Sequence, residues 1–278
     1  MRILVAITLA AACGPNGRGD GPDATGSGSG SGTDGSAGDS SRVYAHSGST
    51  LYRIDTQTLQ AISIGSMSGL GTQSLTDLAI DKSDHMVGIT LDKLYTIDAT
   101  SGTVTLIKDL SQSARGFTSL SYVPGDFNNP AVADILVSAN DQGDVFQIDA
   151  TTGGATKIGS YGSVASGKVV SSGDLIGVRG FGIYATVDVG TEPMDYLAKI
   201  DPANGWKATP LGTGTQHNNI FGLGFWGGKI YGFVDTGASA SGGTMIEIDP
   251  NTGASTDLTS GNVRWFGAGV ATDAPIIQ

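Results

Sequence analysis

Two aspartates are the strongest candidates for chemistry in this chain. Asp77 and Asp174 open two strand-like segments, Asp77-Leu78-Ala79 and Asp174-Leu175-Ile176, at the same place in two repeats of the sequence. Paired carboxylates bind hard cations such as Ca²⁺, whose ligands are oxygen atoms, and can serve as an acid/base pair in glycoside hydrolysis. We expect a metal site at Asp77 and Asp174, with Ca²⁺ as the matching ion. The alternatives are an acid/base pair and a purely structural role as strand caps.

Three further residues are candidates for ligand binding. His217 lies in a polar loop, Thr215-Gln216-His217-Asn218-Asn219, that leads into an apolar run. Trp226 and Trp265 flank two other apolar runs, and exposed aromatic rings at such places often stack on sugars or partner proteins. We expect these three residues to contribute to a binding surface, and the alternative for the tryptophans is core packing.

Catalytic motifs are weak throughout the chain. There are three histidines, with no His-Glu-x-x-His pattern and no Gly-x-Ser-x-Gly nucleophile elbow. Gly222-x-Gly224-x-x-Gly227 matches a dinucleotide fingerprint only formally, because the following Lys229-Ile230-Tyr231-Gly232-Phe233 is typical of a strand, whereas the fingerprint needs a helix. Whether the protein is an enzyme stays open at this point.

One short motif recurs five times and organises the chain. Its second and fourth positions are apolar and its central position is polar, the period of two that is typical of a β-strand. The five copies are Leu51-Tyr52-Arg53-Ile54-Asp55, Leu94-Tyr95-Thr96-Ile97-Asp98, Val145-Phe146-Gln147-Ile148-Asp149, Leu197-Ala198-Lys199-Ile200-Asp201 and Met245-Ile246-Glu247-Ile248-Asp249. Turn residues follow each aspartate, with Gly at the left-handed position in four copies, and a second short strand follows the turn. Each repeat therefore predicts an antiparallel hairpin.

Two more strand-like runs precede each hairpin, so the repeats predict units of four strands. Successive repeat aspartates are 43, 51, 52 and 48 residues apart. Four-stranded units at this spacing, without helical periodicity, indicate a β-propeller. We predict an all-β, five-bladed propeller of four-stranded antiparallel blades over residues 42–278. Its ring would be closed by residues 263–271, which add the innermost strand to the N-terminal blade and remove an exposed edge.

The innermost strands of this propeller can be aligned. Their central triplets are Asp77-Leu78-Ala79, Ser119-Leu120-Ser121, Asp174-Leu175-Ile176, Gly222-Leu223-Gly224 and Gly267-Ala268-Gly269. Small residues suit the place where five sheets converge, and the middle leucine should pack between neighbouring blades. The repeats resemble those of bacterial WD40-like and quinoprotein-like propellers. That resemblance implies the fold and leaves the function open, because this fold hosts enzymes, sugar binders and scaffolds.

The N-terminal segment is typical of an exported protein. Met1-Arg2 is followed by a short apolar run and small residues before Cys13, the chain's one cysteine, which is the pattern of a signal peptide. It resembles the lipobox of bacterial lipoproteins, although Ala10 stands where that family usually has Leu. The resemblance implies a signal peptide over residues 1–12, lipidation of Cys13 and, with Gly14 next, attachment to the outer membrane. The Gly/Ser/Asp-rich remainder of residues 13–41 predicts a flexible linker.

Charge narrows the choice of partners. The net charge is −11, with 15 basic and 26 acidic residues, and nucleic-acid binding depends on clustered Lys and Arg, so we expect no nucleic-acid partner. The resulting expectation is a binding or interaction module tethered to the periplasmic or outer side of the outer membrane, with an envelope protein or a glycan as partner. The alternative is an exported propeller enzyme, lactonase-, lyase-, cyclase- or glycosidase-like, that uses carboxylates or a metal at the channel mouth.

Overall fold

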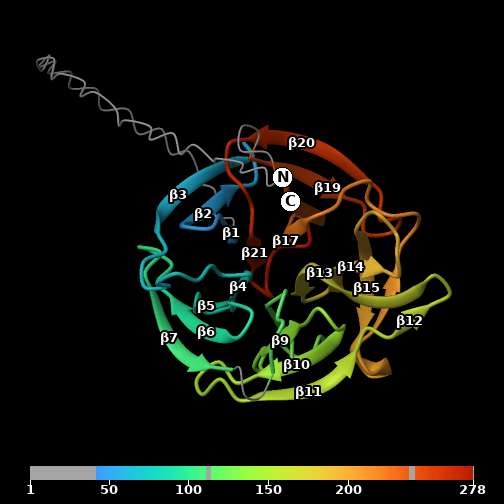
Figure 1. Cartoon of the computed structure of the whole chain (residues 1–278), viewed down its shortest axis with the longest axis horizontal. Coiled ribbons are helices and arrows are strands. Elements are labelled where there is room, and N and C mark those ends of the chain that lie inside the picture. Colours follow the sequence, from blue (N-terminus) through green and yellow to red (C-terminus); the bar gives the residue numbers. More distant parts are fainter. Residues whose placement is uncertain (1–41, 111–113, 238–241, 278) are drawn as a thin grey trace, which may run out of the picture. The chain divides into compact units, whose positions relative to one another are not determined.

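The computed structural model describes residues 42–110, 114–237 and 242–277. These residues form five antiparallel sheets arranged as the blades of a ring (Figure 1). The outer strands β3, β7, β11 and β20 follow the perimeter, and β4, β13, β17 and β21 lie around the middle. The prediction of an all-β, five-bladed propeller is therefore confirmed.

Each blade is named here from the axis outward. Blade 1 contains β21 (Gly267–Val270), β1 (Val43–His46), β2 (Thr50–Asp55) and β3 (Gln60–Ser66). Blade 2 contains β4 (Asp77–Ile80), β5 (Met86–Ile89), β6 (Lys93–Ile97) and β7 (Val104–Asp109). Blade 3 contains β8 (Ser121–Val123), β9 (Ile135–Ala139), β10 (Asp144–Ile148) and β11 (Ala155–Ser160). Blade 4 contains β13 (Gly167–Val178), β14 (Gly182–Val189), β15 (Tyr196–Asp201) and β16 (Lys207–Pro210). Blade 5 contains β17 (Ile220–Trp226), β18 (Lys229–Asp235), β19 (Gly243–Ile248) and β20 (Ser255–Gly261).

Blade 4 carries one strand more than the repeat predicts. The short β12 (Ser163–Val164) pairs with the start of the long β13, in the register Ser163↔Lys168. Gly162 and Gly167 both adopt positive φ at this hairpin, which suits a residue without a side chain. The addition extends the inner edge of the blade and leaves the five-blade ring unchanged.

Ring closure joins the two ends of the described chain. β21 pairs antiparallel with β1, from Val43↔Val270 to His46↔Gly267. Arg42 then bonds the Asp273 carboxylate at 3.0 Å. The predicted addition of a C-terminal strand to the N-terminal blade is confirmed, and the ring has no free inner edge at this junction.

The repeated Asp turns form as the sequence predicts. In each, the aspartate carboxylate accepts backbone N–H groups two or three residues later; Asp98, for example, accepts from Thr100 at 2.8 Å and Ser101 at 3.0 Å. Gly102 then takes a left-handed φ of 76°. In the first copy, which lacks the glycine, Leu59 adopts φ 60° instead, an unfavourable conformation for a branched residue.

Apolar side chains fill the space between the blades. The aligned leucines Leu78, Leu120, Leu175 and Leu223 are at most 1% exposed. Each shares a buried cluster with residues of the preceding blade; Leu223, for instance, packs with Ile176 and Val178. The prediction that the middle leucine packs between blades is confirmed, and this packing fixes the positions of the five innermost strands.

Candidate functional site

The axis of the propeller is occupied by the Asp77 and Asp174 side chains. Both residues are fully buried, and their carboxyl groups hydrogen-bond to each other across the axis. They come from blades 2 and 4, which are not neighbours. The sequence alignment therefore placed them correctly at the same level of two innermost strands, and the ring brings them together.

These two carboxyl groups bind all five innermost strands. Asp77 accepts the backbone N–H of its own neighbour Leu78 at 2.8 Å, of Leu120 in blade 3 at 2.6 Å and of Ala268 in blade 1 at 3.2 Å. Asp174 accepts those of Leu175 and of Leu223 in blade 5, both at 2.5 Å. The five donors are the middle residues of the aligned triplets. We call this arrangement the axial carboxyl pair.

The environment of the pair favours retention of a proton. Burial raises the pKa of Asp174 to about 8, and burial together with the adjacent Asp174 raises the pKa of Asp77. Five N–H donors partly offset this cost, because hydrogen bonds to a carboxylate stabilise its charged form. Two carboxyl groups in direct hydrogen-bond contact, away from water, keep at least one proton between them near neutral pH.

This geometry does not fit the expected calcium site. Every oxygen of the pair that would face a cation already accepts backbone N–H groups, whose partial positive charge opposes a cation. Among the described residues, no group of three or more His, Cys, Asp or Glu side chains is placed to hold a metal ion. The pair also does not fit a glycosidase, whose carboxyl groups stand about 5–9.5 Å apart around the scissile bond. Asp77 and Asp174 are instead placed as strand caps.

Two other buried polar residues adjoin the pair. His46 is fully buried, and burial lowers the pKa of its imidazole to about 4. Its Nδ1 lies 2.9 Å from the Ser47 carbonyl oxygen. A Cβ on Gly267 would lie 2.5 Å from His46 Nε2 and 2.7 Å from Asp77 Oδ1, so glycine is required where the imidazole and the carboxyl group approach β21. Tyr161 is also buried, next to Asp174.

A pocket of about 360 Å³ opens at the end of the axis where the innermost strands begin. Its lining residues come from all five blades, and all but Leu91 lie before or in the first half of an innermost strand. They are Ser74, Leu75, Thr76, Leu91, Thr118, Ser172, Phe221 and Phe266. Thr76, Phe221 and Phe266 each stand two residues before an N–H donor of the axial carboxyl pair. We call this cavity the axial pocket, and its volume lies at the small end of the usual range for ligand sites, about 300–1,000 Å³.

The chemistry of the axial pocket is mixed. Phe221 and Phe266 contribute aromatic rings, and Ser74 and Thr76 carry hydroxyl groups. The hydroxyl oxygens of Thr118 and Ser172 are buried beneath the pocket surface. The Thr118 Oγ1 atom is buried and has no hydrogen-bond partner among the described residues. Beside Ser172, a second buried carboxyl, Asp195, accepts the Ile220 N–H at 2.8 Å, and burial raises its pKa to about 7.

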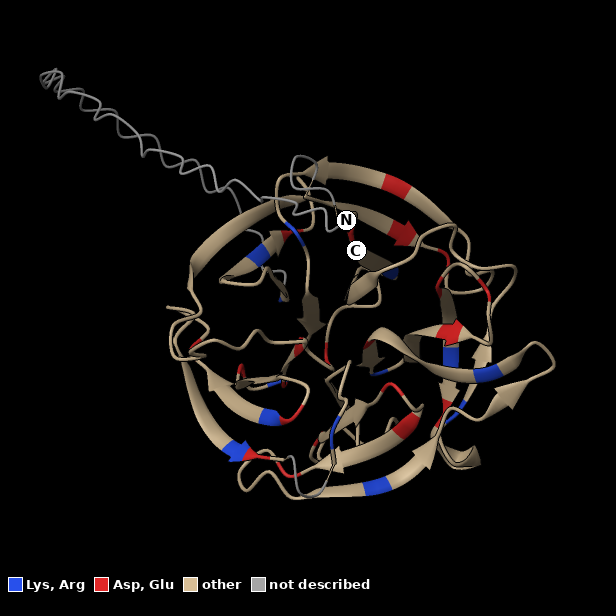
Figure 2. Cartoon of the chain, in the orientation of Figure 1, with Lys and Arg blue, Asp and Glu red and all other residues tan. Residues whose placement is uncertain are grey.

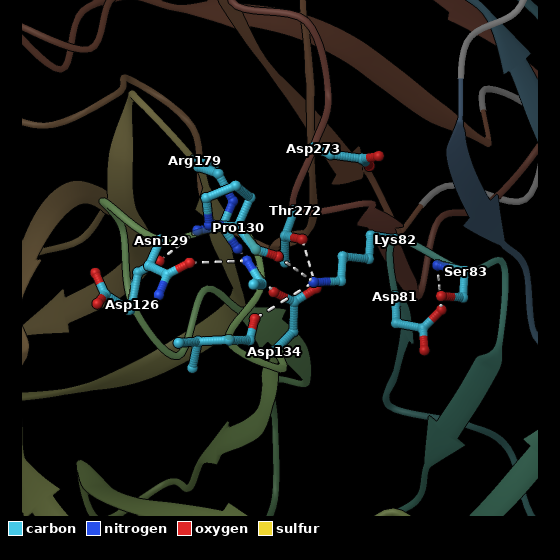
Figure 3. Close-up of polar contacts among 12 residues, drawn as sticks. Asp81, Lys82, Ser83, Asp126, Asn129, Pro130, Asp134, Arg179, Thr272 and Asp273 are labelled. Carbon is cyan, nitrogen blue, oxygen red and sulfur yellow. Dashed lines mark hydrogen bonds and ion pairs between the residues drawn. The ribbon is translucent and has the colours of Figure 1, made fainter.

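A polar network lies after the innermost strands, away from the axial pocket (Figure 3). Arg179 bonds the Asp134 carboxylate at 3.2 Å, and the Thr272 hydroxyl donates to the same carboxylate at 2.6 Å. Lys82 donates to the Pro130 carbonyl at 2.8 Å. These residues follow the innermost strands of blades 1, 2, 3 and 4. The Asp134 side chain is only 3% exposed, so Arg179 and Thr272 bind it inside the fold, whereas the bond from Lys82 to Pro130 is exposed.

The structure does not bring the other predicted ligand residues to the axial pocket. His217 bonds Asp257 in the outer strand β20, at 2.9 Å. Trp226 ends β17 at the far end from the pocket and packs against the core. Trp265 is 4% exposed and packs edge-on against Tyr52 and Phe233. These three residues do not form one site, and the core-packing alternative describes both tryptophans.

The predicted N-terminal features lie outside the described residues. Cys13, the proposed signal peptide and most of the linker precede Arg42. Within the described part of the chain, no helix has the length and apolar character to cross a membrane. The lipidation of Cys13 and the outer-membrane location therefore stay predictions.

Sequence reasoning missed the pocket-lining residues. The signal was present in the alignment, because Thr76, Thr118, Phe221 and Phe266 each stand directly before an aligned triplet. Side chains at that position leave the crowded axis and reach its open end. Reading one residue upstream of the aligned triplets would have identified them.

Comparisons with known proteins add little to this description. No family model and no curated protein matches the chain. Three similar solved structures are PorZ, a surface component of the type-IX secretion system of Porphyromonas gingivalis (14% identity, TM-score 0.35), a computationally designed protein (16%, 0.35) and an auxiliary nutrient binding protein from Bacteroides thetaiotaomicron (10%, 0.46). They match 77%, 81% and 80% of this chain, which spans 31%, 60% and 58% of theirs. At these TM-scores the likenesses carry no argument about function.

Proposed function

We propose that this protein is an exported, lipid-anchored binding module whose propeller holds a small ligand in the axial pocket. The observation that carries the proposal is that residues from all five blades line one pocket at the end of the axis where the innermost strands begin. Pockets at the mouths of closed β-structures are common ligand sites. The rigid inner strands beneath it hold the lining residues in place.

The residues that line this pocket favour binding over catalysis. The described residues that line it carry hydroxyl groups and apolar side chains, and none is an acid, a base or an activated nucleophile. The Asp77 and Asp174 carboxyls lie on the same axis, but both residues are fully buried and engaged with backbone N–H groups. A general acid or base must reach a substrate proton within about 3 Å.

The proposed anchor is the lipidated Cys13, followed by the linker to residue 41. This part of the proposal rests on the lipobox-like segment of the sequence. In the described part of the ribbon in Figure 2, the blue Lys and Arg positions are spread over several blades. Binding to anionic lipid or nucleic acid depends on clustered basic side chains. A lipid anchor would keep the pocket at the membrane without any contact between the propeller and lipid headgroups.

A thermal-shift screen tests the ligand site. The chain from residue 14 onward is heated with panels of neutral sugars, sugar acids, amines, short fatty acids and Ca²⁺. A ligand at 100 times its Kd adds about 2.7 kcal/mol, which raises the Tm by several degrees. The proposal expects a shift that Phe221→Ala abolishes and His217→Ala preserves. A shift that survives Phe221→Ala, or no shift with any panel, contradicts it.

A further inference from the structure

The side chains that line the axial pocket carry no charge. None of its eight described lining residues is acidic or basic. Arg264 stands over the Phe266 ring but lies outside the lining and is already paired with Asp235, at 2.6 Å. A charged ligand group inside the pocket would lose its water without gaining a counter-charge from the lining, which is costly. A ligand can therefore bury only uncharged surface here, and any charged group that it carries must stay in water at the mouth.

The hydroxyl groups of the lining add little polarity to the pocket surface. Thr118 and Ser172 line the pocket, but their hydroxyl oxygens are buried beneath its surface. The Thr76 hydroxyl donates its hydrogen to the Ile89 carbonyl oxygen, at 3.1 Å. Ser74 is exposed to solvent, so its hydroxyl can keep water as its partner. The wall that a buried ligand would meet therefore offers few polar atoms.

Large apolar side chains form a continuous wall of the pocket. Phe221 enters blade 5, Phe266 enters blade 1, and Leu75 and Leu91 belong to blade 2. These three blades are consecutive in the ring, because β21 contacts both β17 and β4. Leu75 is only 1% exposed, both phenylalanines are half-buried, and Leu91 is 54% exposed. Apolar surface therefore extends from the buried base of the pocket to its solvent-facing rim.

We infer that the axial pocket binds the unbranched acyl chain of an amphiphile and leaves its polar head group in water at the mouth. A chain of this kind has the two properties that the lining selects, a buried part that is wholly apolar and a polar group at one end only. An apolar cavity of about 150 Å³ holds a benzene ring, so a pocket of about 360 Å³ holds on the order of ten chain carbon atoms. The inference rests on the proposed function, since it names the ligand class for the same pocket.

Calorimetric titration of the chain from residue 14 onward with fatty acids of increasing length tests the acyl-chain site. The probes are butanoate, hexanoate, octanoate, decanoate and dodecanoate. Each added CH₂ group should strengthen binding by about fourfold, which is the effect of moving one CH₂ out of water. The gain should level off at about ten carbon atoms, where the pocket is full. Octanol and octylamine should bind within about threefold of octanoate, because the head group stays in water.

Two exposed leucines provide a matched pair of variants. Leu91→Ala shortens the apolar wall at the rim and should weaken octanoate binding by about fivefold. Leu106→Ala is the control, because Leu106 is equally exposed, at 52% against 54%, but lies on the outer strand β7. It should leave the Kd unchanged. Phe221→Ala, which removes a ring from the wall, should weaken octanoate binding at least about tenfold.

The outcomes separate the ligand class from the site. The acyl-chain inference alone fails if indole or cyclohexanol binds in a way that Phe221→Ala abolishes while the fatty acids do not bind. It also fails if the three head groups differ by more than about tenfold in Kd, or if affinity rises steadily to dodecanoate without levelling off. If fatty acids bind but Leu91→Ala and Phe221→Ala leave the Kd unchanged, the site lies elsewhere and both proposals fail. If no probe binds and none shifts the Tm, both are likewise overturned.

Discussion

The axial carboxyl pair should make the propeller less stable as the pH rises from about 7 to 8. An aspartate in the unfolded chain titrates near pH 3.9, whereas burial raises the pKa of Asp174 to about 8 and that of Asp77 in the same direction. The folded pair therefore keeps a proton that the unfolded chain has lost. Stability from such a group is fully present below the unfolded pKa and is lost as the pH rises through the folded pKa, at about 1.4 kcal/mol per pH unit.

The window from pH 7 to 8 isolates this effect from other buried groups. Burial lowers the pKa of His46 to about 4, so the unfolded chain binds its proton up to about pH 6.5 and stability rises with pH there. That rise opposes the fall caused by the carboxyl pair between about pH 4 and 6.5. Burial raises the pKa of Asp195 to about 7, so most of its contribution is lost by that pH and only about 0.4 kcal/mol is lost between pH 7 and 8. Above pH 7 the axial pair dominates, and the free energy of unfolding should drop by about 1 kcal/mol by pH 8, because a group with a folded pKa of about 8 is half deprotonated there.

The variant Asp77→Asn tests this description because it replaces one carboxyl group of the pair by an amide and so removes the shared proton. The amide has one oxygen to accept the N–H groups of Leu78, Leu120 and Ala268, so at least one buried N–H loses its partner. The cost at pH 6 is about 1–3 kcal/mol. The slope between pH 7 and 8 should flatten, because the side-chain amide introduced at this position can donate to an ionised Asp174.

Denaturant unfolding at pH 6, 7 and 8, followed by the fluorescence of the buried Trp206 and Trp265, measures the free energy of unfolding of the wild-type protein and of Asp77→Asn. The values give both the cost of the substitution at pH 6 and the slope between pH 7 and 8. Asp98→Asn is the control, since Asp98 caps an exposed turn and the bonds it accepts from Thr100 and Ser101 lower its pKa. It should leave the slope between pH 7 and 8 unchanged. A wild-type stability that is level from pH 7 to 8, or an Asp77→Asn variant with the wild-type slope, would refute the shared-proton description.

The packing at the axis and the N-terminal segment support three further predictions. Gly267→Ala should lower the free energy of unfolding by about 1–3 kcal/mol through overpacking at the axis. The control Gly261→Ala, at a position with open space around it, should change the free energy of unfolding by less than about 0.5 kcal/mol. Denaturant unfolding midpoints measure both effects. Arg179→Ala should cost about 3–5 kcal/mol because it leaves the buried Asp134 carboxylate without its cation, and the additional change Asp134→Asn should recover part of that loss in a double-mutant cycle. Cys13→Ser should move the protein from the membrane fraction to the soluble fraction of fractionated cells, and unchanged membrane retention would contradict the lipid anchor.

Much of the fold could be predicted from the sequence because each repeat carries its own local signals. The Asp turns are short-range chemistry: Asp249 accepts N–H groups two and three residues away, and Gly253 supplies the left-handed position. Alternating apolar residues then set the faces of the strands. Even ring closure followed from counting residues, because β21 and β1 together complete one repeat length. The β12 hairpin was missed because it adds to a strand without repeating any motif.

The site was harder to predict because its contacts join distant parts of the chain. The sequence put Asp77 and Asp174 at equivalent places, but it could not show that both would be fully used by N–H groups from five strands. That outcome depends on how closely the strands converge, which small residues such as Gly222 permit; a Cβ there would lie 2.7 Å from that of Ala268. His217 was chosen for its polar loop, yet the loop leads outward to Asp257, a pairing that no local pattern encodes.

The axial carboxyl pair and the axial pocket are built on the same strand starts but by different atoms. The pair is bound by backbone N–H groups, such as that of Leu223, whose positions do not depend on the side chains beside them. The pocket is lined by side chains two residues upstream, such as Phe221. Substitution at such a lining position therefore changes the ligand contacts while leaving the hydrogen bonds of the axis intact. Under the proposed function, the binding specificity of this propeller can vary at little cost in stability. The repeats therefore predict the architecture and say little about the proposed ligand.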